Sequence, residues 1–213
     1  LFYEHYDEAI QALCPDYTEM LSLLVDAVPR PAQVVVDLGC GTGTLLEAIG
    51  QRRPEIARLV GLDHNADLLS QAREKLADQP EGRVTLLERD LVKADLPEAD
   101  VFVSSLVLHN LGLIEQIELY HRIARRAGTF LQFESVSGET LEEEEERWTY
   151  LRWWMGRIGM PVRLQELAIE HIRDHDRPLA LSQHRKLAEA EGLDFRVLNA
   201  APGFAVFTAS RRA

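Results

Sequence analysis

The sequence has few of the residues on which disulfide-stabilised and membrane-spanning proteins depend. Its 213 residues include two cysteines, Cys14 and Cys40, which are too few for a disulfide framework and lie in no CxxC or other metal-ligand pattern. No apolar run approaches the roughly 18 residues that a membrane-spanning helix needs, and the first residues show no basic region followed by an apolar stretch. We therefore expect a soluble, cytoplasmic protein with reduced thiols and no bound metal.

Basic residues are also scarce. The chain has 23 Lys and Arg against 35 Asp and Glu, a formal net charge of -12. Proteins that bind nucleic acid normally neutralise the phosphate backbone with clustered Lys and Arg, so this balance argues against DNA or bulk RNA as a partner. Hydrophobic residues make up 46% of the chain, enough apolar material for the core of one domain of this length.

Short β-branched runs alternate with helical patterns through the first two thirds of the chain. The patterns predict strands over 34–38, 58–62, 83–88, 99–104 and 129–134, and helices over 42–52, 66–77 and 113–126. Ala66, Leu69, Ala72 and Leu76 form an apolar stripe behind a possible N-cap, Asn65. Such alternation is typical of an α/β fold with a parallel sheet and crossover helices.

The pattern changes after residue 134. Thr140 and Glu143 form a capping box at the start of a helical insertion over about 139–175. The apolar stripe that we expect on this insertion consists of Leu141, Trp148, Leu151, Met155 and Ile158. A helix over 182–191 ends at Gly192 and precedes an antiparallel hairpin. We expect one domain over 1–213, with 1–30 as a helical cap and 139–175 as a lid.

The most informative segment is VVVDLGCGTG, residues 34–43. Here a buried strand runs into a turn with glycine at 39, 41 and 43, where the backbone can bend tightly and a ligand can approach closely. Many loops use glycine only for its positive φ, so this turn by itself is a weak signal.

Polar residues at the ends of the next strands make the signal more specific. Asp63 lies 24 residues after Gly39, close to the spacing of about 20 at which a carboxylate accepts hydrogen bonds from ribose hydroxyls. Asp90 ends the third strand, and Ser104, Ser105, His109 and Asn110 follow the fourth. Because the carboxyl ends of parallel strands share one edge of the sheet, these segments converge on one crevice, where a nucleoside-sized ligand fits.

Two phosphate-binding motifs are missing, which restricts the type of ligand further. Thr44 stands where a dinucleotide fingerprint has its third glycine, and no GxxxxGK[ST] motif is present. Asp37, just before the glycine turn, would repel a pyrophosphate and suits an ammonium group. We infer a ligand with an adenosine-like ribose and a cationic end.

The segments VVVDLGCGTG, VGLDHN, ERDL and SSLVLHNL, in this order and spacing, resemble the class I S-adenosylmethionine-dependent methyltransferases. The resemblance covers about residues 30–135 and 180–210. It implies a Rossmann-like sheet of seven strands in the order 3-2-1-4-5-7-6, with the last inserted strand antiparallel, and S-adenosylmethionine as cofactor. It implies this set of cofactor-binding residues: Tyr6, Asp37, Gly39, Cys40, Gly41, Asp63, His64, Asp90, Leu91 and Ser104.

The resemblance also implies roles within that set. Asp37 would orient the ammonium group and Asp63 would bind both ribose hydroxyls. Asp90 would accept a hydrogen bond from the adenine amino group, and the carbonyl of Ser104 would meet the ammonium group. The N-terminal segment resembles the helices that fold over the cofactor in small bacterial methyltransferases and carboxy-S-adenosylmethionine synthases, and by that analogy Tyr3 and Tyr6 close the pocket or simply pack.

His109 is the first candidate for a catalytic base, and Glu134 is the second. The sulfonium already activates the methyl group, so the protein mainly aligns the acceptor in line with the methyl–sulfur bond and excludes water. A carboxylate or free amine needs no strong base, whereas a hydroxyl of high pKa does. The alternative for His109 is a capping or packing role, and Glu134 has the corresponding structural alternative.

The insertion holds the aromatic residues from which an acceptor pocket could be built. Trp148 suits the core. Trp153 and Trp154 are adjacent in the sequence, so their side chains cannot point in the same direction from a helix. We expect one of them to be lid-facing or to lie at a subunit contact. Three arginines in the same region are candidates to hold a substrate carboxylate or are simply solvated: Arg152, Arg157 and Arg163. His171 and His175 have the spacing of metal ligands, but no third ligand accompanies them.

We therefore predict a methyltransferase that uses S-adenosylmethionine and transfers a methyl group to an O, N or C nucleophile of a small organic molecule. The alternatives are an RNA (tRNA) or protein methyltransferase, a carboxy-S-adenosylmethionine synthase-like enzyme, and a binding module without catalysis. A homodimer is compatible with the sequence.

Overall fold

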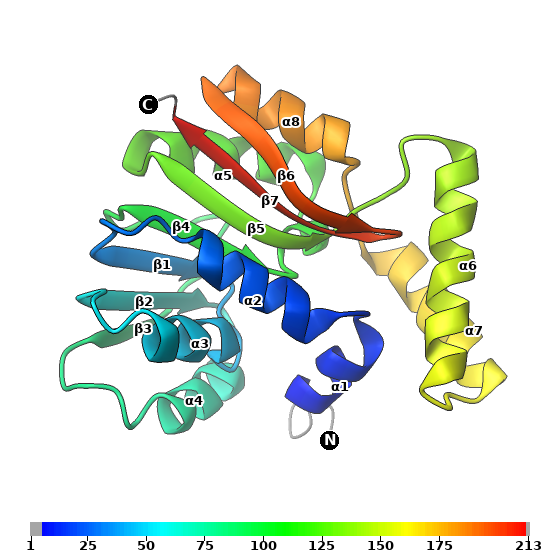
Figure 1. The fold of residues 1–213 in the computed structure, drawn as a ribbon, viewed down its shortest axis with the longest axis horizontal. Helices are drawn as coiled ribbons and strands as arrows, with labels where there is room; N and C mark the ends of the chain where they lie inside the picture. The colour runs from blue at the N-terminus through cyan, green and yellow to red at the C-terminus, as the bar shows by residue number, and fades with distance from the viewer. Residues whose placement is uncertain (1–5, 212–213) are drawn as a thin grey trace.

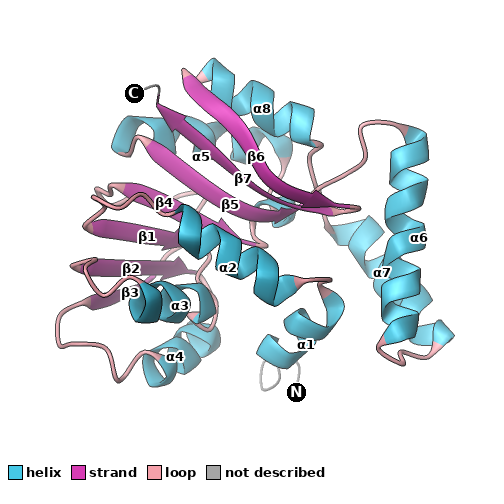
Figure 2. Ribbon diagram, in the orientation of Figure 1, coloured by secondary structure: helices cyan, strands magenta, loops and turns pink. Residues whose placement is uncertain are grey.

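The computed structural model describes residues 6–211, which form a seven-stranded sheet with helices on both faces (Figures 1 and 2). The strand order is β3-β2-β1-β4-β5-β7-β6, as predicted. The strands are β1 (Val34–Leu38), β2 (Arg58–Asp63), β3 (Val84–Glu88), β4 (Val101–Ser105), β5 (Thr129–Ser135), β6 (Leu193–Ala201) and β7 (Phe204–Arg211). Strand β7 runs antiparallel to both of its neighbours, β5 and β6.

The sheet separates two apolar cores. Val35 packs into one core and its neighbour Val36 into the other, because successive side chains of a strand point to opposite faces. Helices α2 (Tyr17–Ala27), α3 (Thr44–Arg52) and α4 (Ala66–Lys75) contribute to the first core. Helices α5 (Leu113–Arg126) and α8 (Leu181–Ala190) contribute to the second core.

Helix α4 begins as the sequence predicts. The side chain of Asn65 accepts hydrogen bonds from the N–H groups of Asp67 and Leu68, at 2.9 and 3.2 Å. These bonds satisfy two of the donors that the first turn of a helix leaves without partners. The predicted stripe is buried from Leu69 onward, but Ala66 is exposed. Ala66 is the first residue of the helix, where the chain has not yet packed onto the sheet.

Two helices, α6 (Leu141–Arg157) and α7 (Val162–His175), form the predicted insertion and project beyond one end of the sheet (Figure 1). Thr140 accepts from the N–H of Glu143, but the Glu143 carboxylate accepts from Glu139 rather than from Thr140, so the capping box is incomplete. The apolar stripe is also shorter than predicted. Leu141 is 87% exposed and Ile158 is 41% exposed.

Leu141 and Ile158 are exposed because they lie at the two ends of α6, beyond the part of the helix that packs on its neighbours. Trp148, Leu151 and Met155, in the middle and last turns, are buried. Among residues 6–211, no helix combines the length and the apolarity needed to span a membrane.

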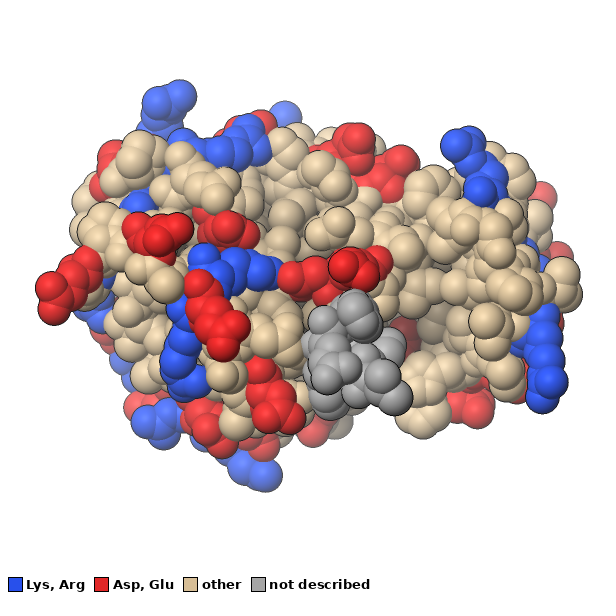
Figure 3. All heavy atoms as spheres, turned by 90° about the horizontal axis from the view of Figure 1, so that it is seen from below, with Lys and Arg blue, Asp and Glu red and all other residues tan. Residues whose placement is uncertain are grey.

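At the N-terminal end, helix α1 (Tyr6–Leu13) lies near the carboxyl edge of the strands, at the same end of the sheet from which the insertion projects (Figure 1). Tyr3 lies outside the described residues. The face seen in Figure 3 carries interspersed acidic and basic side chains on one side and largely uncharged residues on the other. This face has no continuous basic surface of the kind that would hold a nucleic-acid backbone.

Candidate active site

The glycine turn bends around the end of β2. The N–H groups of Gly39 and Cys40 both donate to the carbonyl of Leu62, at 2.7 and 2.9 Å. Gly39 has a φ of +73°, and a Cβ atom there would lie 2.6 Å from a methyl carbon of Val107. Both the backbone conformation and the close approach therefore require glycine at this position.

Asp63 holds the glycine turn against the start of α4. Its Oδ2 accepts from the N–H of Gly41 at 2.9 Å, and its Oδ1 accepts from the N–H of Asn65 at 2.8 Å. The side chain is largely buried, yet it borders a cavity. A carboxylate oxygen has two lone pairs, so each oxygen keeps capacity for one further donor.

A cavity of about 630 Å³ lies at the carboxyl ends of the strands. Its size suits a small-molecule ligand. The predicted cofactor residues that line it are Tyr6, Gly39, Gly41, Asp63, His64, Asp90 and Leu91. The structure thus brings together residues that are separated by up to 85 positions in the sequence.

Asp90 stands at the open side of this cavity. Its Oδ1 accepts from the N–H of Val92 at 2.9 Å, and its Oδ2 pairs with Lys93 at 3.1 Å. The hydrogen bond from Val92 and the interaction with Lys93 lower the pKa of Asp90 below its ordinary value of 3.8, so the carboxylate is charged.

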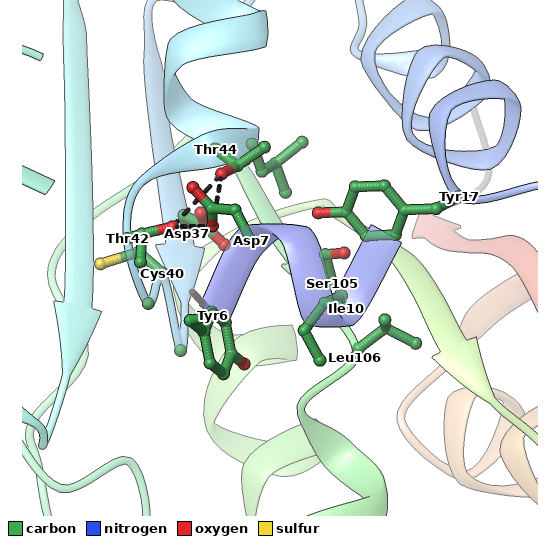
Figure 4. A pocket seen from close by; sticks show the side chains of 13 residues that line it. Tyr6, Asp7, Ile10, Tyr17, Asp37, Cys40, Thr42, Thr44, Ser105 and Leu106 are labelled. Carbon is green, nitrogen blue, oxygen red and sulfur yellow. Dashed lines mark hydrogen bonds between the residues drawn. The ribbon is translucent and has the colours of Figure 1, made fainter. Parts of the chain in front are cut away.

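A second, much smaller cavity of about 40 Å³ adjoins the glycine turn (Figure 4). Asp37 and Cys40 line it from the sheet, and Tyr17 lines it from α2. Asp37 is 1% exposed, and both of its carboxylate oxygens lack a hydrogen-bond partner among the described residues. Burial and the nearby charge of Asp63 raise the pKa of Asp37 well above its ordinary value of 3.8. A buried carboxylate without donors is costly, and a cation placed beside it would relieve that cost.

The fourth strand meets both cavities through Ser105 rather than Ser104. Ser104 is fully buried and its hydroxyl oxygen has no hydrogen-bond partner within residues 6–211, whereas Ser105 and Leu106 line both cavities. Leu106 has a φ of +57°, a left-handed conformation that is uncommon for a residue with a Cβ atom. Its N–H donates to the carbonyl of Phe133 at 2.7 Å, which ties this bend to β5.

The two candidate catalytic residues contact each other. Nδ1 of His109 lies 2.5 Å from Oε1 of Glu134, and Oε2 of Glu134 accepts from the N–H groups of Val107 and Leu108 at 3.1 and 2.6 Å. Burial lowers the pKa of His109, but the charge and hydrogen bond of Glu134 outweigh it and hold the pKa above its ordinary 6.5. Burial raises the pKa of Glu134, but His109 and the backbone donors outweigh it and hold this pKa below 4.5.

His109 does not line either cavity, whereas Asn110 lines the larger one. Because an ionised Glu134 only accepts hydrogen bonds, Nδ1 of His109 is the donor, and Nε2 carries a lone pair when the imidazole is neutral. The amide of Asn110 lies 3.2 Å from that Nε2 atom. Asn110 therefore stands between the imidazole and the cavity.

Tyr17 and His171 are among the lining residues that were not predicted as ligand contacts. Tyr17 reaches the smaller cavity from the start of α2, and its only signal in the sequence is the helix break at Pro15 just before it. His171 lines the larger cavity from α7, with its ring 4.2 Å from that of His175. Among the described residues, no group of three or more His, Cys, Asp or Glu side chains is placed to hold a metal ion.

The Trp, Tyr and Arg residues of the insertion do not line these two cavities. Nε1 of Trp154 donates to the carbonyl of Ala12 at 2.8 Å, while Trp153 is 51% exposed and stacks on Tyr150. The two adjacent tryptophans thus differ in direction, as predicted. Arg152 pairs with Glu166 at 3.0 Å, so its charge is already compensated.

Comparisons with known proteins agree with this architecture. A family profile described as "Methyltransferase domain" matches residues 36–128. The carboxy-S-adenosyl-L-methionine synthase of Sulfurimonas denitrificans is 29% identical over 137 residues, which cover 62% of this chain and 58% of that protein. The chain therefore matches little more than half the length of this relative.

Solved structures share the fold at low sequence identity. An O-methyltransferase family protein from Burkholderia thailandensis matches 99% of this chain and 60% of its own, with a TM-score of 0.72 and 16% identity. Human N-acetylserotonin methyltransferase, solved in complex with SAM, matches 100% of this chain and 55% of its own, with a TM-score of 0.67 and 18% identity.

Proposed function

We propose that this chain is a class I S-adenosylmethionine-dependent methyltransferase, which binds S-adenosylmethionine and methylates a small organic acceptor. The observation that carries this proposal is the carboxylate of Asp37, which is buried beside the glycine turn without a hydrogen-bond donor. An ammonium group supplies the donors and the positive charge that this carboxylate lacks.

The other polar groups fit the rest of the cofactor. Asp63 keeps acceptor capacity for ribose hydroxyls, because each of its oxygens receives one backbone hydrogen bond. Asp90 and Leu91 line the same cavity and suit the adenine ring and its amino group. The hydroxyl of Tyr17 and the backbone near Ser105 border the amino-acid end.

The bound cofactor supplies a methyl group that its sulfonium already activates. This chain's residues contribute binding, alignment and the exclusion of water. Where the acceptor is a hydroxyl, His109 takes the proton at Nε2, while Glu134 keeps Nδ1 protonated and the ring in place. Asn110 occupies Nε2 in this structure, so the acceptor hydroxyl has to replace that amide.

The charge of the residues that line the two cavities favours methyl transfer over the use of a carboxylated cofactor, which the name of the bacterial synthases implies. A carboxylated cofactor carries an additional negative charge, which needs a nearby cation. Within the described part of the chain, no Lys or Arg lines either cavity, and Asp37, Asp63 and Asp90 all do. The net charge of -12 likewise favours a small acceptor over RNA.

Calorimetry with two cofactor-derived ligands tests the proposal. S-adenosylhomocysteine carries the amino-acid end, whereas 5′-methylthioadenosine lacks it. We expect both ligands to bind, and we expect Asp63→Ala to weaken both by about 1–3 kcal/mol because ribose donors lose their acceptor. Asp37→Asn should weaken only the first ligand. Absence of S-adenosylhomocysteine binding, or binding unchanged in Asp63→Ala, would refute the proposal.

The acceptor class needs a separate assay. With labelled cofactor, we expect more transfer to a small-molecule extract than to total tRNA or to protein. Mass spectrometry of the ligand that co-purifies with the protein distinguishes S-adenosylmethionine from a heavier, carboxylated form. A predominantly carboxylated ligand, or faster transfer to tRNA, would contradict the proposed reaction.

A further inference from the structure

We propose that helix α1 is a strap across the amino-acid end of the cofactor site, that Asp7 with Lys75 and Trp154 with Ala12 fasten its two ends, and that its release sets the rate of cofactor exchange. The inference rests on the proposed function for the identity of the ligand. The opening of the helix itself is measurable without any ligand.

Helix α1 is attached to the molecule by few apolar contacts. None of its residues is buried, although it covers part of the cofactor site. Tyr6, Asp7 and Ile10 of α1 line the smaller cavity (Figure 4). A helix of eight residues is marginally stable by itself in water, so polar contacts at its ends decide whether it stays docked.

Asp7 fastens the first end. Its Oδ2 pairs with Nζ of Lys75 on α4 at 2.5 Å, and its Oδ1 accepts from the hydroxyl of Thr42 in the glycine turn at 2.5 Å. Lys75 also donates to the hydroxyl of Thr44 at 2.7 Å. The Asp7 and Lys75 side chains are 34% and 21% exposed, so solvent screens this ion pair only in part.

Trp154 fastens the second end from a different element. Its indole Nε1 donates to the carbonyl of Ala12, in the last turn of α1, at 2.8 Å. That carbonyl lies where a helix leaves its acceptors without intrahelical partners. The strap therefore spans the ligand edge from α4 to α6, and its two fastenings come from opposite sides.

The closed strap leaves too little room beneath it for an amino-acid chain. The cavity next to Asp37 has a volume of about 40 Å³, far below the roughly 300 Å³ at which ligand pockets begin. The ring of Tyr6 lies over Gly41, 3.8 Å from where a Cβ of that glycine would stand. The amino-acid end can reach Asp37 only when α1 moves, and the same movement has to precede its release.

Rates of ligand exchange test the proposal. Stopped-flow displacement would give the release rate of S-adenosylhomocysteine from the wild type and from Asp7→Asn, Lys75→Met and Trp154→Phe. We expect each variant to release, and to bind, about fivefold faster, since each loses one fastening. High salt should accelerate exchange in the wild type and in Trp154→Phe, but not in Asp7→Asn.

Three control variants match the tested ones, because they change either a neighbouring residue or a residue of the same chemical type. Trp153→Phe alters the neighbouring indole, which is 51% exposed and stacks on Tyr150 of its own helix. Asp78→Asn and Lys186→Met remove exposed charges outside the site. All three controls should exchange ligand at the wild-type rate. The double variant Asp7→Asn/Lys75→Met should be no faster than either single variant, because both break the same ion pair.

Hydrogen exchange separates this inference from the proposed function. Without ligand, amides of residues 6–13 should exchange faster in Asp7→Asn and Trp154→Phe than in the wild type, while those of β1 stay protected. Unchanged protection of α1, or release rates within twofold of the wild type, would overturn the strap. Faster release without faster association would also overturn it, since Asp7 would then be a ligand contact. Absence of ligand binding in the wild type would reject only the proposed function.

Discussion

Nδ1 of His109 lies 2.5 Å from Oε1 of Glu134, and this pair joins the turn after β4 to the end of β5. The carboxylate is fully buried and also accepts three backbone N–H groups, from Val107, Leu108 and Ser135. One side chain thus fixes both the backbone beside the cavity and the orientation of the imidazole.

The first prediction concerns the pH dependence of this pair. The pKa of His109 is raised, so its contribution to stability is complete below 6.5 and is lost as pH rises through the folded value. The pKa of Glu134 is lowered, so its contribution is complete above 4.5 and is lost as pH falls through the folded value. The unfolding free energy of the wild type should therefore exceed that of Glu134→Gln by the largest margin between pH 4.5 and 6.5.

The expected margin for Glu134→Gln is about 3 kcal/mol, because a buried pair loses one partner. Urea unfolding at several pH values measures it. Glu191→Gln is the control, since Glu191 pairs with the half-exposed His121 at 3.0 Å and should cost less than about 1 kcal/mol. An NMR titration should also show a lower pKa for His109 in Glu134→Gln. A margin that does not vary with pH would contradict the assignment.

The second prediction is that ligand binding releases a proton from Asp37. Burial and the charge of Asp63 raise the pKa of Asp37 in the free protein, and a bound ammonium group lowers it again. Calorimetry of S-adenosylhomocysteine in buffers of different ionisation enthalpy, between pH 5 and 7, should give heats that depend on the buffer. Asp37→Asn should remove that dependence, whereas equal heats for the wild type in all buffers would argue against a protonated Asp37.

The third prediction distinguishes two reasons why position 39 requires glycine, its positive φ and the lack of space for a Cβ atom. Gly39 and Gly82 have similar φ values, +73° and +76°, but an added Cβ meets Val107 at 2.6 Å in the first case and nothing within 4 Å in the second. Gly82→Ala should cost about 1 kcal/mol of stability through backbone strain alone. Gly39→Ala should cost about 1–3 kcal/mol more through the collision.

Thermal unfolding measures both variants, and Val107→Ala serves as a second-site change. The double variant Gly39→Ala/Val107→Ala should recover part of the loss, because it removes the methyl groups that collide. Equal losses for the two glycine variants would mean that the space beside Gly39 is not limiting.

The fourth prediction concerns acid stability. His184 is buried, and its Nδ1 lies 3.1 Å from the hydroxyl of Tyr120, which accepts from Gln132 at 2.7 Å. Burial lowers the pKa of His184 to about 4. As the pH falls, His184 binds its proton at a higher pH in the unfolded chain than in the folded protein. The free energy of unfolding should therefore fall as the pH drops from 6.5 toward 4, by on the order of 3 kcal/mol. In His184→Gln this fall should be smaller, as urea midpoints at pH 7 and pH 5 would show.

Much of the fold could be predicted from periodicity and turn residues. The strand at 34–38 and the helix at 113–126 have the predicted bounds, because a continuous run of buried residues and helical spacing are both properties of neighbouring residues. The errors occur at the ends of elements. Leu141 has the right spacing for the apolar stripe but lies in the first turn of α6, where no neighbouring element covers it.

The candidate site was less predictable where it depends on side-chain direction. Ser104 and Ser105 are adjacent and chemically alike, and only their positions in β4 decide that Ser105 lines the cavity. His109 follows the predicted strand, yet its imidazole turns toward Glu134, away from the cavity.

The amino-acid sequence alone determined the alternation of strands and helices and the residues gathered at the carboxyl ends of the strands, because glycine positions, carboxylates and apolar periodicity are properties of short segments. The order of the strands came from the resemblance to a known family. The tertiary structure alone decided which groups lack partners and which are already paired. Asp37 and Asp7 are both carboxylates in the sequence, but one is buried without a donor and the other is bound to Lys75. Such differences arise from contacts between residues far apart along the chain, and local patterns carry no information about them.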